Sequence, residues 1–385
     1  MDPLLGSCSL DDLRRRTSLK WRTYPDDVLP AFVAEMDFDI AEPIKDAVRS
    51  AVGNGDTGYS HKGALGEAFA AFARKRLGWS PDPARVFVIP DVMTGIVEMI
   101  MALTPPGSGI VINPPVYAPF FFRIGFAGRR VVEAPLLRSH DGGYDLDLDA
   151  LDSALADENV SAYLLCSPHN PVGRVWSSDQ LTGVARLCQQ HGKLLLVDEI
   201  HAPLVLPGAR HVPFLTLDHD ATERTILFTS ASKGWNIPGL KCGVAVAGSD
   251  EIARLLAQRW EALLAGNLGV LASVAAFQES LPWLDAVLAQ LDENRSYMSR
   301  LLAEHLPAVK YVRPQASFLA WLDCDLLGLG DDPAAAFLAR GQVALSPGPD
   351  FGTHGKGFAR LNMGTSPALM QEAVRRMAKA AAAAR

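Results

Sequence analysis

Cysteines are scarce in this sequence, and their spacing fits neither a metal site nor a disulfide framework. Among the 385 residues there are five, at Cys8, Cys166, Cys188, Cys242 and Cys324. They are far apart, show no CxxC spacing and have no paired histidines nearby. We therefore expect no bound metal, and reduced cysteines that are mostly buried as small hydrophobic side chains in a cytoplasmic protein.

Long apolar runs and an excess of positive charge are also missing. Residues 1–21 carry charges inside every short apolar stretch, so we expect no signal peptide. The longest apolar runs, such as residues 96–103 with Glu98 inside, fall well short of the roughly 18 residues that a membrane-spanning helix needs. Lys and Arg total 36 against 43 Asp and Glu, a net charge of −7, which argues against a nucleic-acid partner.

The composition is that of a folded globular protein. Hydrophobic residues make up 49% of the chain and charged residues 21%, which argues against a disordered chain, a fibre or a coiled coil. At roughly 150 residues per domain, a chain of 385 residues predicts two or three domains. We expect two.

Short β-branched runs alternate with helical patterns from residue 85 onward. The expected strands and helices are residues 86–90, 94–103 (helix), 109–114, 161–166, 178–191 (helix), 193–199 and 225–230. Such alternation predicts an α/β domain whose mainly parallel sheet is covered by helices on both faces.

The pattern changes after residue 282. A long amphipathic helix over residues 283–305 leads to strands at 309–312 and 318–323, a helix after Pro333, a strand at 343–345 and a final helix. This order predicts a second, smaller α+β domain.

Three of the expected strands lead into polar residues. Asn170 follows the run 161–166, Asp198 and His201 follow 194–197, and Lys233 follows 225–229. Because ligands of open parallel sheets bind beyond the carboxyl ends of the strands, we expect these side chains to meet at one edge. A lysine among small residues in such a place is desolvated, which lowers its pKa and suits it to form a Schiff base with a carbonyl.

Other interpretations of these residues carry less weight. Lys233 taken alone could be a solvated surface charge, and His201 could be a core histidine. Asp198, after four aliphatic residues, could be the carboxylate of an ATPase, but the sequence has no phosphate-binding Gly-x-x-x-x-Gly-Lys-Ser/Thr loop.

Four motifs together resemble a known family over nearly the whole chain. They are Asn170-Pro171-x-Gly173, Asp198-x-x-His201, Ser230-x-x-Lys233 and Gly239-x-Lys241. The set resembles the fold-type I enzymes that use pyridoxal 5′-phosphate (PLP). The strings LKWRTYPDDVLPAFVAEMDFD, CSPHNPVGRVW, VDEIHAPLV and SKGWNIPGLKCG are similar to the carbon–sulfur β-lyase branch of the class I/II aminotransferase family, that of the MalY/PatB type of cystathionine β-lyase.

The resemblance implies roles for the residues around the cofactor ring. Lys233 would bind PLP covalently and later move the Cα proton of the substrate. Asp198 would pair with the pyridine nitrogen and keep it protonated. Asn170 would hydrogen-bond the ring oxygen, and His201 would stand where many aminotransferases have a tyrosine. Tyr117 would stack on the ring, although a purely structural aromatic is the alternative.

The resemblance also implies a binding site for the cofactor phosphate. Its donors would be Ser230, Ser232, Lys241 and the backbone amides of Val92 and Met93. The chain departs from the family at two places. Most members have arginine in place of Lys241, and glycine is common in place of Asp91, whose negative charge beside a phosphate needs an explanation.

Two further residues are assigned to the substrate and to a second subunit. Arg360 resembles the arginine that binds the α-carboxylate together with Asn170, although a surface ion pair is the alternative. Tyr59 resembles the tyrosine that reaches the neighbouring subunit's phosphate and assists catalysis, which implies a homodimer with shared active sites. The predicted division is residues 1–48 with the small domain or the dimer contact, 49–284 as the PLP-binding domain and 285–385 as the small domain.

The function implied by the resemblance is α,β-elimination from a sulfur amino acid. Cystathionine or another cysteine S-conjugate would yield pyruvate, ammonia and a thiol such as homocysteine, as in methionine biosynthesis. The main alternative is an aminotransferase of an L-amino acid, which shares the cofactor and the first steps. A regulatory binding protein on the same fold is a third reading.

Overall fold

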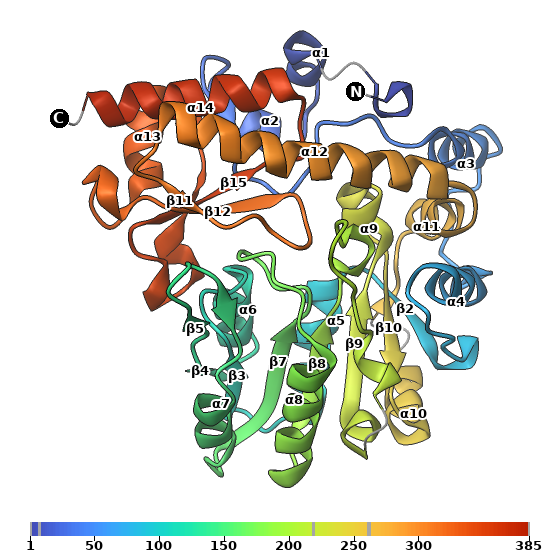
Figure 1. The fold of residues 1–385 in the computed structure, drawn as a ribbon. Helices are drawn as coiled ribbons and strands as arrows, with labels where there is room; N and C mark the ends of the chain where they lie inside the picture. The colour runs from blue at the N-terminus through green and yellow to red at the C-terminus, as the bar shows by residue number, and fades with distance from the viewer. Residues whose placement is uncertain (1, 7–8, 218–219, 260–262, 384–385) are drawn as a thin grey trace.

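A computed structural model describes residues 2–6, 9–217, 220–259 and 263–383. A large sheet lies in one half of the molecule, and a smaller sheet with the long helix α12 (Leu281–His305) lies in the other (Figure 1). No helix in the described ranges is long and apolar enough to cross a membrane.

The large sheet has seven strands in the order β2-β10-β9-β8-β7-β3-β4. Their bounds are β2 (Val86–Ile89), β3 (Gly109–Ile112), β4 (Arg130–Glu133), β7 (Val160–Cys166), β8 (Leu194–Asp198), β9 (Thr225–Thr229) and β10 (Gly243–Ala247). The pairs from β4 to β9 are parallel, and β10 runs antiparallel to both β9 and β2. The predicted α/β fold with a mainly parallel sheet is confirmed.

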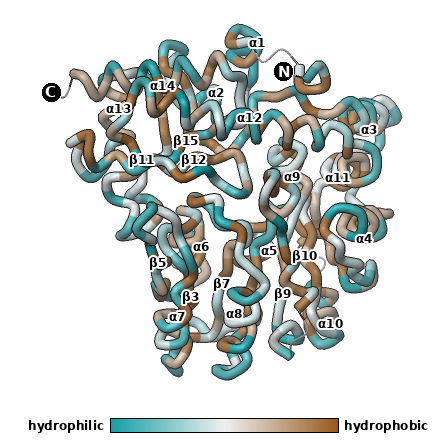
Figure 2. Tube along the Cα trace, in the orientation of Figure 1, coloured by the Kyte–Doolittle hydropathy of each residue, from teal (hydrophilic) through white to brown (hydrophobic). Residues whose placement is uncertain are grey.

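Helices cover both faces of this sheet, and strand β8 shows why. Leu195 and Val197 belong to the core formed with α7 (Leu148–Leu155) and α8 (Ser178–Gln190). Leu194 and Leu196 belong to the opposite core, with α5 (Val92–Leu103) and α6 (Pro119–Phe126). Both sets are apolar because neither face meets water, and hydrophobic residues dominate these strands (Figure 2).

The smaller sheet has four strands, β11 (Lys310–Tyr311), β12 (Leu319–Asp323), β15 (Phe358–Asn362) and β14 (Ser346–Pro347), in that order. The helices α12, α13 (Pro333–Gly341) and α14 (Pro367–Ala382) share a separate hydrophobic core with it. Near the other end of the chain, β1 (Leu29–Pro30) pairs in parallel with β13 (Val343–Ala344). The N-terminal segment therefore contacts the C-terminal part of the chain, while the predicted domain boundaries stay predictions.

The structure differs from the sequence-based expectation in several details. Strands β4 and β10 of the large sheet and helices α6 and α7 were not predicted. Helix α5 begins at Val92 and not near Thr94, because the carboxylate of Asp91 caps it by accepting the Thr94 amide at 2.8 Å. Among the cysteines, Cys166, Cys188, Cys242 and Cys324 are free and buried as predicted, and Cys8 lies outside the described residues.

Candidate active site

The carboxyl ends of β7, β8 and β9 lie on the side of the large sheet that faces the small sheet (Figure 1). Asp198 is the last residue of β8, and Lys233 lies in the short helix α9 (Ala231–Gly234) directly after β9. From the other side, β15 contributes Arg360, whose Nη1 donates to the Oδ1 of Asn170 at 3.1 Å. The structure thus brings together Asn170, Asp198, Lys233 and Arg360, four of the residues that the sequence assigned to one site.

The Lys233 amine is a candidate nucleophile. It is partly buried, and its Nζ donates to the backbone carbonyl of Ala34 at 2.7 Å. Burial lowers the pKa of Lys233 to about 8, and the charge of Arg360 acts in the same direction. No carboxylate forms an ion pair with it among the described residues. A larger fraction of this amine is therefore unprotonated near neutral pH than in an exposed lysine.

Asp198 is suited to hold a proton. Its side chain is buried, and its Oδ1 accepts the amide of Ile200 at 3.0 Å. Burial raises the pKa of Asp198 to about 7, which the Ile200 amide and the charge of Lys233 only partly oppose. A carboxyl group in this state can share a proton with a basic nitrogen placed against it.

His201 is buried and neutral. Burial lowers its pKa to about 3, with the charges of Lys233 and Arg360 acting in the same direction. Its ring packs edge-to-face on Phe318 at 6.4 Å between centroids. In the described part of the chain its Nδ1 has no hydrogen-bond partner, so this polar atom is available to a bound group.

Arg360 is a buried cation without a carboxylate. It is only 6% exposed, and its Nη2 donates to the carbonyl of Phe32 and to the Oγ of Ser346, both at 3.0 Å. Its guanidinium lies over the Phe351 ring at 5.0 Å. The residues described include no acidic partner for it, its Nε is unpartnered, and burial lowers its pKa to about 10. Such a group is expected to bind an anion.

Tyr117 lies among these charges. Burial raises the pKa of its hydroxyl, the charge of Arg360 opposes this, and Asp198 and Asp91 add to it. Its ring packs edge-to-face on Phe120 at 5.6 Å. The position is compatible with the predicted stacking on a cofactor ring, which stays a prediction.

The structure explains the negative charge at Asp91. Its carboxylate accepts the amide and the hydroxyl of Thr94 and forms an ion pair with the Nζ of Lys241 at 2.5 Å. Asp91 is thus neutralised by the cation that the sequence assigned to a phosphate. The amides of Val92 and Met93 remain at the N-terminus of α5, where an anion is favoured.

The Ser230 hydroxyl and the Ser232 backbone amide, both directly after β9, are already hydrogen-bonded. Ser230 is the N-cap of α9, where its hydroxyl accepts the Ser232 amide at 3.0 Å and donates to the carbonyl of Cys242 at 2.6 Å. To donate to a phosphate, the Ser230 hydroxyl must rotate away from Cys242, so the predicted roles of both serines stay predictions.

Tyr59 does not join the site within one chain. Its side chain is 97% exposed, and its backbone forms an isolated bridge with Gly266. The role assigned to it concerns a second subunit and stays a prediction.

Sequence reasoning missed two groups that hold the site. Asn236 and Asn362 donate to backbone carbonyls of residues 33–38, the segment whose Ala34 carbonyl meets Lys233. The only sequence signal was that this segment is irregular and marked by proline.

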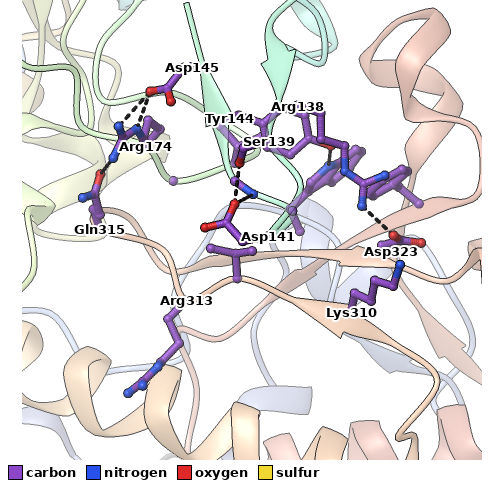
Figure 3. A pocket seen from close by; sticks show the side chains of 17 residues that line it. Arg138, Ser139, Asp141, Tyr144, Asp145, Arg174, Lys310, Arg313, Gln315 and Asp323 are labelled. Carbon is purple, nitrogen blue, oxygen red and sulfur yellow. Dashed lines mark hydrogen bonds and ion pairs between the residues drawn. The ribbon is translucent and has the colours of Figure 1, made fainter.

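A separate pocket of about 240 Å³ lies beside the site, between the hairpin β5 (Leu137–Arg138) and β6 (Tyr144–Asp145) and the small sheet. Figure 3 shows Arg138 reaching Asp323 of β12, at 2.6 Å, across this junction. Trp321 lines the pocket and packs on Phe351, the ring that carries the Arg360 guanidinium. Neither Arg360 nor Lys233 lines the pocket, and the packed rings of Trp321 and Phe351 link it to the guanidinium.

Comparisons with known proteins agree with this arrangement. A family model described as aminotransferase class I and II matches residues 32–377. A protein of Mycobacterium tuberculosis named "Putative cystathionine beta-lyase" is 44% identical over 97% of both chains. The cystathionine beta-lyase PatB of Bacillus subtilis is 35% identical over 91% of this chain and 92% of its own.

A solved structure has the same fold. The crystal structure of cystalysin from Treponema denticola, which contains a pyridoxal 5′-phosphate cofactor, superposes with a TM-score of 0.92 at 27% identity, covering 97% of this chain and 98% of that one. The residues matched by the family model include the large sheet, the four-stranded small sheet and every site residue described above. The chain therefore belongs to the aminotransferase class I and II family.

Proposed function

We propose that this protein is a PLP-dependent carbon–sulfur β-lyase that converts cystathionine or another cysteine S-conjugate and one water molecule to pyruvate, ammonia and a thiol such as homocysteine. One observation carries the proposal. The buried guanidinium of Arg360 has no carboxylate partner among the described residues, and it lies close enough to the Lys233 amine to lower the pKa of that amine. An α-amino acid has the two groups that these residues can act on: a carboxylate for Arg360 and a Cα proton for the Lys233 amine.

The residues present fit PLP. Lys233 supplies an amine for its aldehyde, Asp198 a buried carboxyl of raised pKa for its ring nitrogen, and Asn170 an amide for its ring oxygen. The neutral His201, whose Nδ1 has no hydrogen-bond partner among the described residues, lies near enough to Lys233 and Arg360 for their charges to lower its pKa. For the phosphate, the amides at the start of α5 and the Lys241 ammonium are the available donors.

When bound, PLP supplies an electron sink that stabilises negative charge at the substrate Cα. Asp198 holds a proton at the ring nitrogen, which its raised pKa permits near neutral pH. Arg360 holds the α-carboxylate and so fixes the position of Cα. Lys233 removes the Cα proton through its Nζ. With its pKa lowered to about 8, roughly a tenth of this amine is neutral at pH 7.

Elimination, not amino transfer, is the preferred outcome because the substrate class carries a leaving thiolate at Cβ. The names of the relatives support this preference: both the M. tuberculosis and the B. subtilis proteins are named cystathionine beta-lyases. An aminotransferase is the alternative, since it would use the same Lys233, Asp198 and Arg360.

We also propose a cytoplasmic homodimer with shared active sites, acting in sulfur amino acid metabolism. The 97% exposure of Tyr59 supports the dimer, because a tyrosine so exposed in one subunit is free to reach another. The division into residues 1–48, 49–284 and 285–385 belongs to the same proposal.

The test is release of pyruvate from cystathionine and from S-alkyl cysteines by the purified protein, supplied with PLP and with no keto acid. We expect pyruvate and thiol in equal amounts from the wild type, and neither from Lys233→Ala. Lys356→Ala removes an exposed lysine paired with Asp331 and serves as the control that keeps activity. Amino transfer that depends on an added keto acid, without pyruvate from the thioethers, would establish the aminotransferase instead.

A further inference from the structure

One irregular segment near the N-terminus is held almost entirely by side chains from elsewhere in the chain. Each backbone carbonyl from residue 32 to residue 38, a stretch we call the strap, accepts a hydrogen bond from a distant side chain. The donors are Arg16, Lys20, Lys233, Asn236, Ser346, Arg360 and Asn362. Two of them, Lys233 and Arg360, belong to the candidate active site.

Asn236 hydrogen-bonds both backbone groups of one residue in the strap, Met36. Its Oδ1 accepts the Met36 amide at 2.8 Å, and its Nδ2 donates to the Met36 carbonyl, also at 2.8 Å. A primary amide is the side chain that can pair with both backbone groups of a residue in this way. Asn236 therefore binds Met36 much as a neighbouring strand would.

Asn236 also belongs to the turn that carries Lys233. It follows α9 in the chain. The turn is closed by a hydrogen bond of 3.0 Å from the Ile237 amide to the Ser232 carbonyl. Its φ of 58° lies in the left-handed region, which asparagine tolerates better than most residues. The turn thus contacts the strap at two points, Lys233 at Ala34 and Asn236 at Met36.

We propose that Asn236 is a positioning residue, which fixes the strap so that the Ala34 carbonyl orients the Lys233 amine and the Phe32 carbonyl orients the Arg360 guanidinium. This inference rests on the proposed function. Asn236 does not touch the reacting atoms. It acts through the strap, whose carbonyls otherwise have no rigid secondary structure to hold them in place.

The proposal predicts a split between the kinetic constants. When the strap loosens, the Phe32 carbonyl, which also accepts the Ser346 hydroxyl, holds the Nη2 of Arg360 less firmly, so carboxylate binding weakens and KM rises. Asn236→Gly removes two neutral hydrogen bonds at Met36, each worth about a factor of five in the equilibrium that holds the strap in place, so KM should rise by up to about 30-fold. The value of kcat falls less, because Lys233 keeps its burial. A purely structural asparagine would lower the amount of folded protein without changing KM.

The test compares Asn236→Gly with Gln342→Gly. Both positions have a left-handed φ, 58° and 54°, so glycine keeps the backbone in each case. Gln342 ends α13, and its side chain pairs with the exposed Asp27, outside the strap. A third variant, Asn236→Asp, keeps the shape and the acceptor for the Met36 amide but removes the donor to the Met36 carbonyl.

Hydrogen–deuterium exchange of the purified full chain, followed on peptides covering residues 30–39, is the readout that does not depend on activity. We expect faster exchange there in Asn236→Gly, a raised KM in both Asn236 variants, and neither change in Gln342→Gly. Unchanged strap exchange and unchanged KM in both Asn236 variants would overturn the proposal, as would faster exchange spread evenly over the chain with a wild-type KM. If the wild type releases no pyruvate, the proposed function fails, while the exchange of the strap still decides whether Asn236 holds it.

Discussion

Replacing Arg360 with lysine tests the carboxylate site without removing its charge. The guanidinium of Arg360 already donates to Asn170 through Nη1 and to Phe32 and Ser346 through Nη2. Its Nε has no partner among the residues described. To bind a carboxylate with two donors, the planar fork must exchange one of its Nη2 contacts for the substrate, whereas an ammonium is a single point charge.

The size of the effect follows from that geometry. In Arg360→Lys, the charge persists but one of two charge-assisted hydrogen bonds to the substrate is lost, which is worth about 1.5–3 kcal/mol. This corresponds to a rise in KM of about 10- to 150-fold. Since Lys233 and Asp198 are untouched, kcat should fall much less.

Initial rates of pyruvate release over a range of cystathionine concentrations measure both constants. Arg313→Lys, a change of the same kind at an exposed arginine, is the control and should leave them unchanged. The visible absorbance of the bound cofactor should persist in Arg360→Lys, which shows that its site is intact. A wild-type KM in this variant would refute the assignment of Arg360 to the substrate carboxylate.

Three other outcomes are expected. Asp198→Asn cannot hold a proton at the cofactor nitrogen, so kcat should fall at least 100-fold, about 2.7 kcal/mol, with PLP still bound by absorbance. An unchanged kcat would contradict its role. Lys20→Met leaves the buried carboxylate of Asp37 without its 2.6 Å ion pair, and the free energy of unfolding from urea titration should fall by about 3–5 kcal/mol. A smaller change than 1 kcal/mol would show that Asp37 is solvated. Burial lowers the pKa of His201 to about 3 and of His169 to about 4, whereas unfolded histidine binds a proton near pH 6.5. The unfolded chain therefore binds more protons below pH 6.5, and stability should decline as the pH falls from 6.5 to 4, less steeply in His201→Asn. An equal slope in that variant would contradict the neutral state of His201.

Much of the fold was predictable because local pattern and burial agree in the parallel strands. The run that became β8 is apolar on both faces and ends in Asp198, so its place in the middle of the sheet and its polar end follow from sequence. Strand β10 was missed because its Gly-Val-Ala-Val-Ala sequence is short and rich in small residues. Its antiparallel direction depends on its neighbours β9 and β2 and not on its own sequence.

The candidate site was predictable only in part. Lys233, Asp198 and Asn170 follow strands, so one rule about strand ends places all three. The strap and Asn236 were missed because the contact joins residues 200 apart in the chain. The pairing of Lys241 with Asp91 was missed for the same reason, since the two residues are 150 apart. No periodicity or spacing signals such pairs.

The proposed chemistry depends most on a single covalent link between PLP and the lysine that follows β9. Borohydride reduction of the PLP-loaded protein, followed by proteolysis and mass spectrometry, locates that link directly. We predict that the peptide containing Lys233 carries the phosphopyridoxyl group and that the same peptide is unmodified without PLP. A reduced cofactor found on another lysine, or on none, would contradict the assignment of Lys233 and with it the proposed chemistry.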